Sequence, residues 1–145
     1  MKLENKLKKW SLAKWKKELW RTFSLYVKIR DKYKCFTCGR KVKGINAQGG
    51  HFIPAGACGL ELYFHEDNVN CQCSYCNLTL QGNQYEYGKR LGEEKVKELR
   101  DIYFKRNHER QYSKQDYVNL INFYDSKINE CQTQKQKYVD SENSF

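Results

Sequence analysis

The sequence predicts a helix-rich α+β fold that is closed around a zinc site, and three observations lead to it. Two Cys-x-x-Cys pairs, Cys35/Cys38 and Cys73/Cys76, have the spacing at which each pair can give two thiolates to one tetrahedral ion. Apolar residues recur at helical spacing near both ends of the chain, whereas short strand-like runs lie between the cysteine pairs. A single proline and an aromatic content of 14% favour a folded chain over a disordered one.

Residues 1–34 are expected to form a basic amphipathic helix. Its apolar positions recur at helical spacing and are Leu3, Leu7, Trp10, Trp15, Leu19, Phe23 and Val27. The segment carries 12 Lys and Arg against 3 Asp and Glu, whereas the rest of the chain carries 15 against 14. This asymmetry indicates a polyanionic partner, either nucleic acid or an anionic membrane, and we expect the lysines to contact DNA phosphates and not merely to be solvated. The apolar stripe continues into the first cysteine pair, so we expect it to pack on the core and not on a membrane.

Residues 35–92 are expected to form the core region of the fold, which the zinc site closes. The first cysteine pair predicts a zinc knuckle followed by a turn. Two short strands are predicted at His51–Ile53 and Leu60–Phe64, joined by a loop that contains proline and glycine. Asn68 to Cys73 is expected to be a loop, and a helix is expected to begin at Ser74.

Residues 93–138 are expected to form the C-terminal helices. Glu93 and Glu94 follow Gly92, which is a charge pattern suited to the first turn of a helix. Ser113 and Asp116 resemble a capping box at the start of a further helix. Residues 139–145 are expected to be a disordered tail.

The seven cysteines favour metal binding over disulfides. Their number is odd, and the chain shows neither an apolar run of membrane-spanning length nor a secretory signal, so we expect reduced thiols and a cytoplasmic location. Cys71 adds a third thiol beside the second pair, but only Cys73 and Cys76 have the two-residue spacer. Cys58 and Cys131 are expected to be buried or free thiols and not ligands.

Between the cysteine pairs, His51, then Asn68, then Asn77 directly after Cys76 resemble the order of the ββα-metal, or HNH, nuclease core. Together with flanking residues, the chain resembles the phage recombination protein NinG (Rap) family over about residues 19–100. The residues that carry this resemblance are Leu19-Trp20, Phe23-Ser24, Tyr26, Arg30-Asp31, Asn68-Val69, Gln72-Cys73, Cys76-Asn77, Gly82-Asn83, Tyr87, Leu91-Gly92-Glu93-Glu94 and Val96.

The resemblance implies a ββα-metal core and a metal-dependent endonuclease in the cytoplasm of a bacterial host. It would cut branched recombination intermediates such as Holliday junctions and leave 5′-phosphate ends. A neutral imidazole suits proton abstraction from water, so His51 is the expected general base. Asn68 is expected to hold the catalytic loop by hydrogen bonds to backbone. Asn77 is expected to present its amide oxygen to Mg²⁺ or Mn²⁺, while zinc stays structural.

One position departs from the HNH pattern. Many HNH sites have an Asp or His directly before the base, but Gly50 stands there, so water and phosphate oxygens would have to complete the shell of the ion. His65, Glu66 and Asp67 are alternative donors, although each also fits an ordinary loop residue. The alternative function is a non-catalytic zinc protein that binds nucleic acid. Symmetric cleavage of a junction would favour a homodimer.

Overall fold

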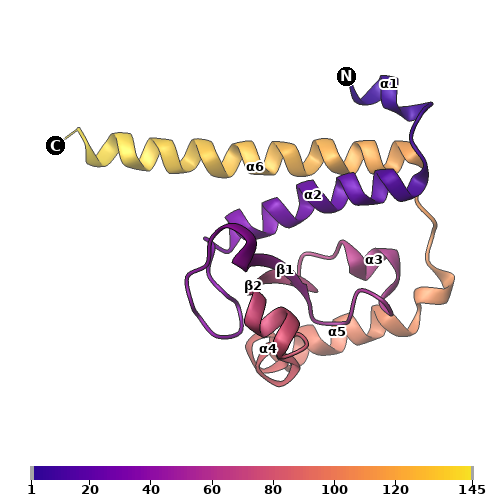
Figure 1. The fold of residues 1–145 in the computed structure, drawn as a ribbon, viewed down its shortest axis with the longest axis horizontal. Coiled ribbons are helices and arrows are strands. Elements are labelled where there is room, and N and C mark those ends of the chain that lie inside the picture. Colours follow the sequence, from indigo (N-terminus) through magenta and orange to yellow (C-terminus); the bar gives the residue numbers. More distant parts are fainter. Residues whose placement is uncertain (1, 145) are drawn as a thin grey trace.

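The structure is a computed structural model that describes residues 2–144 (Figure 1). It has two N-terminal helices where the sequence predicted one. Helix α1 spans Leu3–Leu7 and α2 spans Leu12–Arg30. The break arises because the Ser11 hydroxyl accepts the backbone N–H of Lys14 and so caps α2. Helix α2 buries its apolar side, as predicted, between the small sheet and the long C-terminal helix.

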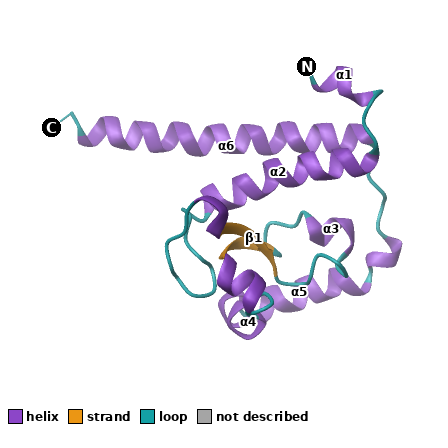
Figure 2. Cartoon of the chain, in the orientation of Figure 1, coloured by secondary structure: helices purple, strands orange, loops and turns teal. Residues whose placement is uncertain are grey.

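The sheet has two antiparallel strands (Figure 2); the first lies two to four residues before its predicted position, and the second was not predicted. Strand β1 spans Ala47–His51 after the 3-10 turn η1 (Gly44–Asn46), and β2 spans Val69–Cys73. Every residue of β2 is buried, including two polar ones, so the strand lacks the alternating pattern by which strands are recognised. The predicted loop from Asn68 to Cys73 is therefore wrong.

The second predicted strand, Leu60–Phe64, is also wrong, because helix α3 (Gly59–Tyr63) occupies this segment. The Glu109 carboxylate accepts the backbone N–H groups of Leu60 and Glu61 at 2.7 and 3.1 Å. These are donors of the first helical turn, which have no partner within the helix. Since Glu109 lies nearly fifty residues further along the chain, the local sequence carries no sign of this cap.

The C-terminal helices follow the prediction. A π-helical turn η2 (Tyr75–Thr79) and α4 (Gln84–Leu91) come after β2, and then α5 (Glu93–Phe104) and the turn η3 (Arg106–His108). Helix α6 spans Lys114–Glu142 and begins with the predicted capping box of Ser113 and Asp116. It extends past the end of α2 (Figure 1), and residues 139–142, predicted as part of a disordered tail, continue it.

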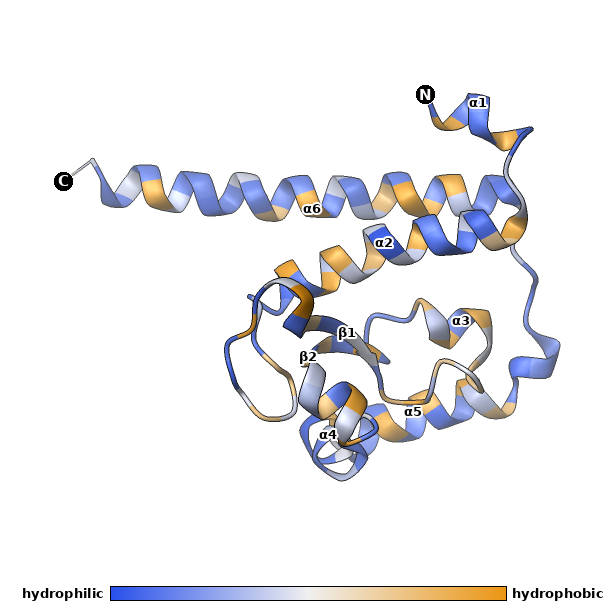
Figure 3. Cartoon of the chain, viewed as in Figure 1, coloured by the Kyte–Doolittle hydropathy of each residue, from blue (hydrophilic) through white to orange (hydrophobic). Residues whose placement is uncertain are grey.

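Helices α2 and α6 pack side by side and share the largest hydrophobic core. Along each helix, hydrophobic residues alternate with hydrophilic ones (Figure 3). A polar network joins both helices to the loop before β2. The Glu66 carboxylate accepts hydrogen bonds from Tyr26, Tyr124 and Lys127 at 3.1, 3.3 and 2.7 Å. Arg30 donates to the Glu66 carbonyl at 2.9 Å. This network fixes the sheet relative to the helices.

None of the helices between residues 2 and 144 combines the length and the apolar composition that crossing a bilayer requires.

Candidate metal centre and active site

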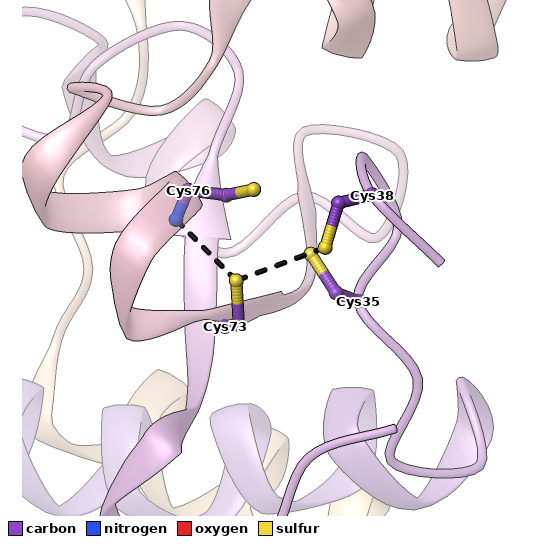
Figure 4. A group of neighbouring side chains, drawn as sticks. All are labelled: Cys35, Cys38, Cys73 and Cys76. Carbon is purple, nitrogen blue, oxygen red and sulfur yellow. Dashed lines mark hydrogen bonds between the residues drawn. The ribbon is translucent and has the colours of Figure 1, made fainter. Parts of the chain in front are cut away.

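The four predicted zinc ligands lie together. The Sγ atoms of Cys35, Cys38, Cys73 and Cys76 are all within 4.8 Å of one another, and Cys38 and Cys73 approach to 3.9 Å (Figure 4). Zn–S bonds of about 2.3 Å at tetrahedral angles place sulfur atoms a little under 4 Å apart. The cluster therefore has the ligand set and nearly the spacing of a structural zinc site, and the four predicted cysteines form a group that could hold a metal ion such as zinc.

Local structure on both sides aims these thiols inward. Residues 34–41 form a knuckle that is closed by a bridge between Lys34 and Lys41, and Phe36 donates its backbone N–H to the carbonyl of Cys71 in β2. Burial raises the pKa of the Cys35 thiol, but hydrogen bonds from the Thr37 hydroxyl and from backbone amides bring it down to about 6. Such a thiol is readily ionised for metal binding.

The remaining cysteines lie outside the cluster, as predicted. Cys71 is fully buried beside it, and burial raises the pKa of this thiol to about 11. Burial has the same effect on Cys58, which contacts the carbonyls of Ala55 and Gly59. Cys131 is half-buried on α6. Protonated, buried thiols behave as small hydrophobic side chains.

His51 is the last residue of β1, and its ring is held in one tautomer. Its Nε2 lies 3.0 Å from the carbonyl oxygen of Tyr63. A carbonyl only accepts, so Nε2 carries the proton and the neutral ring keeps its lone pair on Nδ1. Burial lowers the pKa of His51 below its ordinary value of 6.5, the Tyr63 carbonyl opposes this, and the charge of Lys16 adds to it. The imidazole is thus neutral near pH 7, with Nδ1 as its proton acceptor.

Two aromatic rings fix the imidazole in place. Trp20 of α2 stacks on it, with ring centroids 5.0 Å apart and planes 18° apart, and the Tyr63 ring lies 4.8 Å away. A Cβ atom at Gly49 would lie 3.0 Å from the Trp20 ring, so only glycine lets this ring approach β1 so closely. The Nζ of Lys16, one turn before Trp20, lies 4.1 Å above the centre of the Tyr63 ring.

Asn68 makes the contacts that the sequence assigned to it. It is fully buried, and its Oδ1 accepts the backbone N–H of Ile53 at 2.7 Å. Its Nδ2 donates to the carbonyls of Ile53 and Leu62 at 3.2 and 3.0 Å. These bonds join the loop after His51 to the end of α3, where Tyr63 holds the imidazole. Asn68 therefore orders the loop after His51 and the end of α3 that contacts the imidazole.

Asn77 is not brought next to His51. Its Nδ2 donates to Oε1 of Gln48 at 2.8 Å. Strand residues alternate between faces, so Gln48 and His51 lie on opposite faces of β1, about 10 Å apart along the strand. The face of His51 contacts α2, and the other face contacts Gln72 and η2. The predicted general base and the predicted ion ligand thus occupy different sides of the sheet.

The absence of a side chain at position 50 has a steric reason. A Cβ atom at Gly50 would overlap the amide of Gln72, which is fully buried on β2. Gln72 donates to Thr37 and to the carbonyl of Gly82, while its Oε1 has no hydrogen-bond partner among the described residues. The space that an acidic or imidazole ligand would fill in the HNH pattern is therefore taken by Gln72.

We expect Gly50→Ala to lower the free energy of unfolding by about 1–3 kcal/mol, because the added methyl group overpacks this site. The measurement is chemical denaturation, with Gly56→Ala as the control, since a Cβ atom there meets nothing within 4 Å. In Gly50→Ala/Gln72→Ala the overlap is removed, so the double variant should lose less stability than the sum of the two single variants. Strict additivity would contradict the steric explanation.

The alternative donors of the 65–67 loop are engaged elsewhere. Glu66 binds Lys127 and two tyrosines, Asp67 pairs with Lys95 at 2.7 Å, and the His65 ring accepts the backbone N–H of Asp67. Across residues 2–144, the cysteine cluster is the one group of three or more His, Cys, Asp or Glu side chains that is placed to hold a metal. No carboxylate-lined site for Mg²⁺ lies beside His51 in that part of the chain.

Sequence reasoning missed the residues that surround His51. The sequence pattern did not single out Lys16, Trp20 entered only through the family resemblance, and Tyr63 was predicted to lie in a strand. Two signals pointed to them: Lys16 and Trp20 are four residues apart, hence on one side of a helix, and Gly49 stands two residues before His51 on the same face of the strand.

A sequence profile of one family, described as Bacteriophage Lambda NinG protein, matches residues 2–135. Comparison with curated proteins gives no match, and comparison with solved structures gives none.

Proposed function

Because a match over residues 2–135 shows that the chain belongs to the NinG family, we propose that it is a DNA endonuclease that acts on branched recombination intermediates. The observation that carries the proposal is the state of His51. Its Nε2–H is bound to the Tyr63 carbonyl and its pKa is lowered by burial, which are the properties of a general base ready at neutral pH.

The reaction is hydrolysis of a phosphodiester. Nδ1 of His51 takes a proton from a water molecule, and the water oxygen forms a bond to phosphorus. The bond from phosphorus to the 3′ oxygen breaks, and this oxygen leaves with a proton from solvent. The products carry a 5′-phosphate and a 3′-hydroxyl. Asn68 supports this step indirectly, because its hydrogen bonds order the loop between β1 and α3.

The proposed divalent ion, Mg²⁺ or Mn²⁺, has little protein coordination. Asn77 offers one neutral amide oxygen, and no carboxylate cluster accompanies it within residues 2–144. Mg²⁺ commonly keeps several waters and binds substrate phosphates, so we propose that the ion enters with the DNA and that Asn77 is a single protein ligand. Bound there, such an ion would neutralise backbone phosphates on the Gln48 side of the sheet.

DNA binding is supported by the charge of the N-terminal helices. Residues 1–34 hold most of the net charge of +10. Neutralising backbone phosphates releases counterions, so the affinity for DNA should fall steeply as salt rises. An interaction through the aromatic residues alone would depend weakly on salt.

The test is a cleavage assay on a synthetic four-way junction, with a linear duplex of matched length as the control substrate. The purified protein with Mg²⁺ or Mn²⁺ should nick the junction in preference to the duplex and leave ends that a ligase can reseal. The lack of carboxylate ligands favours one competing function, a zinc protein that binds nucleic acid without cutting it. Tight junction binding with no cleavage in either ion would support that alternative and overturn the proposal.

A further inference from the structure

The base of the proposed reaction has a fixed positive charge beside it. Lys16 projects from α2 toward the end of β1, and its Nζ lies 4.1 Å above the Tyr63 ring, which itself lies 4.8 Å from the imidazole of His51. A cation over an aromatic face is attracted by the negative face of the ring, so the contact restricts a side chain that is otherwise flexible.

This charge is on the correct side of the sheet, whereas the proposed ion ligand is not. His51 lies on the face of the sheet that α2 covers, and Lys16 belongs to α2; Asn77 lies on the other face, bonded to Gln48. Attack on a phosphodiester adds negative charge to the non-bridging oxygens, and that charge must be stabilised next to the base. Within residues 2–144, no acidic cluster stands ready to hold an ion there.

We propose that Lys16 binds the scissile phosphate beside His51 and neutralises the charge that develops during attack, with Tyr63 and Trp20 as positioning residues. The inference rests on the proposed endonuclease function and assigns the side chain that contacts the reacting group. In the step, Lys16 keeps its proton throughout and donates hydrogen bonds to the phosphate oxygens, while the proton of the attacking water passes to Nδ1 of His51.

Several features of the cluster support this role. Tyr63 contacts both groups, because its carbonyl binds the imidazole and its ring carries Lys16. Trp20, one turn after Lys16 on α2, stacks on the same imidazole through the space left by Gly49. A shift of α2 along the sheet would therefore move both Lys16 and the ring support of the base.

The experiment compares Lys16→Ala with Lys17→Ala in single-turnover cleavage of the four-way junction at saturating protein. Lys17 is exposed on the same helix, and a rotation of about 100° per residue directs it elsewhere, so both variants lose one charge from α2. We expect Lys16→Ala to cut about 10²-fold more slowly than Lys17→Ala, with similar affinities for the junction. Lys16→Arg should recover part of the rate, since it restores the charge.

A second readout separates a catalytic role from a structural one. Removing Lys16 removes a positive charge near His51, so the acid limb of the rate profile should move to higher pH in Lys16→Ala and stay in place in Lys17→Ala. Thermal unfolding of both variants checks the fold. Equal cleavage rates for the two variants would overturn the role of Lys16 and leave the endonuclease standing. A wild-type protein that does not cleave would overturn the endonuclease itself.

Discussion

His51→Ala is expected to lower the rate of junction cleavage by about 10²–10⁴-fold, because it removes the proposed general base. The loss should appear in single-turnover rates, while the affinity for the junction changes little. Trp20 and Tyr63 remain in place, so we expect the variant to fold. His108→Ala is the matched control, since His108 is an exposed imidazole on η3. Cleavage by His51→Ala at the wild-type rate would exclude His51 as the base.

The pH dependence of the reaction follows from the same residue. Burial lowers the pKa of His51 below 6.5, and only the neutral ring accepts a proton, so kcat/KM should rise with pH and have its inflection below pH 6.5. An inflection above that value would contradict a buried base. The free energy of unfolding should change with pH in the same direction as the activity. The unfolded chain binds a proton at the ordinary pKa, so this contribution is present above 6.5 and is lost as pH falls through the lowered pKa.

Replacing Cys73 and Cys76 by serine is expected to remove the bound zinc and unfold the chain. Structural zinc sites contribute about 10–16 kcal/mol, comparable with the whole stability of a small domain. Both residues flank the junction of β2 and η2, and Cys76 donates its backbone N–H to the sulfur of Cys73. Without the ion, three buried thiols and the exposed Cys38 would lose the partner that draws the knuckle against β2.

The measurement is metal analysis together with circular dichroism during thermal unfolding. The wild type should carry about one zinc per chain, and the double variant none, with a broad or absent transition. Cys131→Ser is the control, because Cys131 lies on α6 away from the cluster. Retention of zinc by the double variant would show that other ligands hold it.

The parts of the fold that depend on neighbouring residues were predictable from the sequence. The capping box at Ser113 and the spacing of the two cysteine pairs act over three residues or fewer, and the structure has both where predicted. The strands were misplaced because their reasons are distant. Buried Asn70 and Gln72 are compatible with β2 only because Arg30, Tyr87 and Thr37 bond to them. No local pattern reports such partners.

The site shows the same division. The sequence predicts that Asn68 bonds to the backbone of the loop, and its hydrogen bonds to Ile53 and Leu62 are of that kind. It could not show that strand alternation separates His51 from Asn77, because the limits of β1 were set two to four residues too far along the chain. A shift in the limits of a strand changes which residues can meet across it.

The pairing of α2 with α6 affects how the chain folds during synthesis. Lys114 donates to the carbonyl of Leu7, and Tyr26 packs on Tyr124, so the largest core joins segments about a hundred residues apart. On the ribosome, the part of the apolar side of α2 that faces α6 has no partner until α6 emerges. The zinc knuckle and sheet can form earlier, from residues 35–76. Protein synthesis therefore exposes an aromatic helix for most of its duration, and aggregation in that interval should fall if a chaperone covers α2.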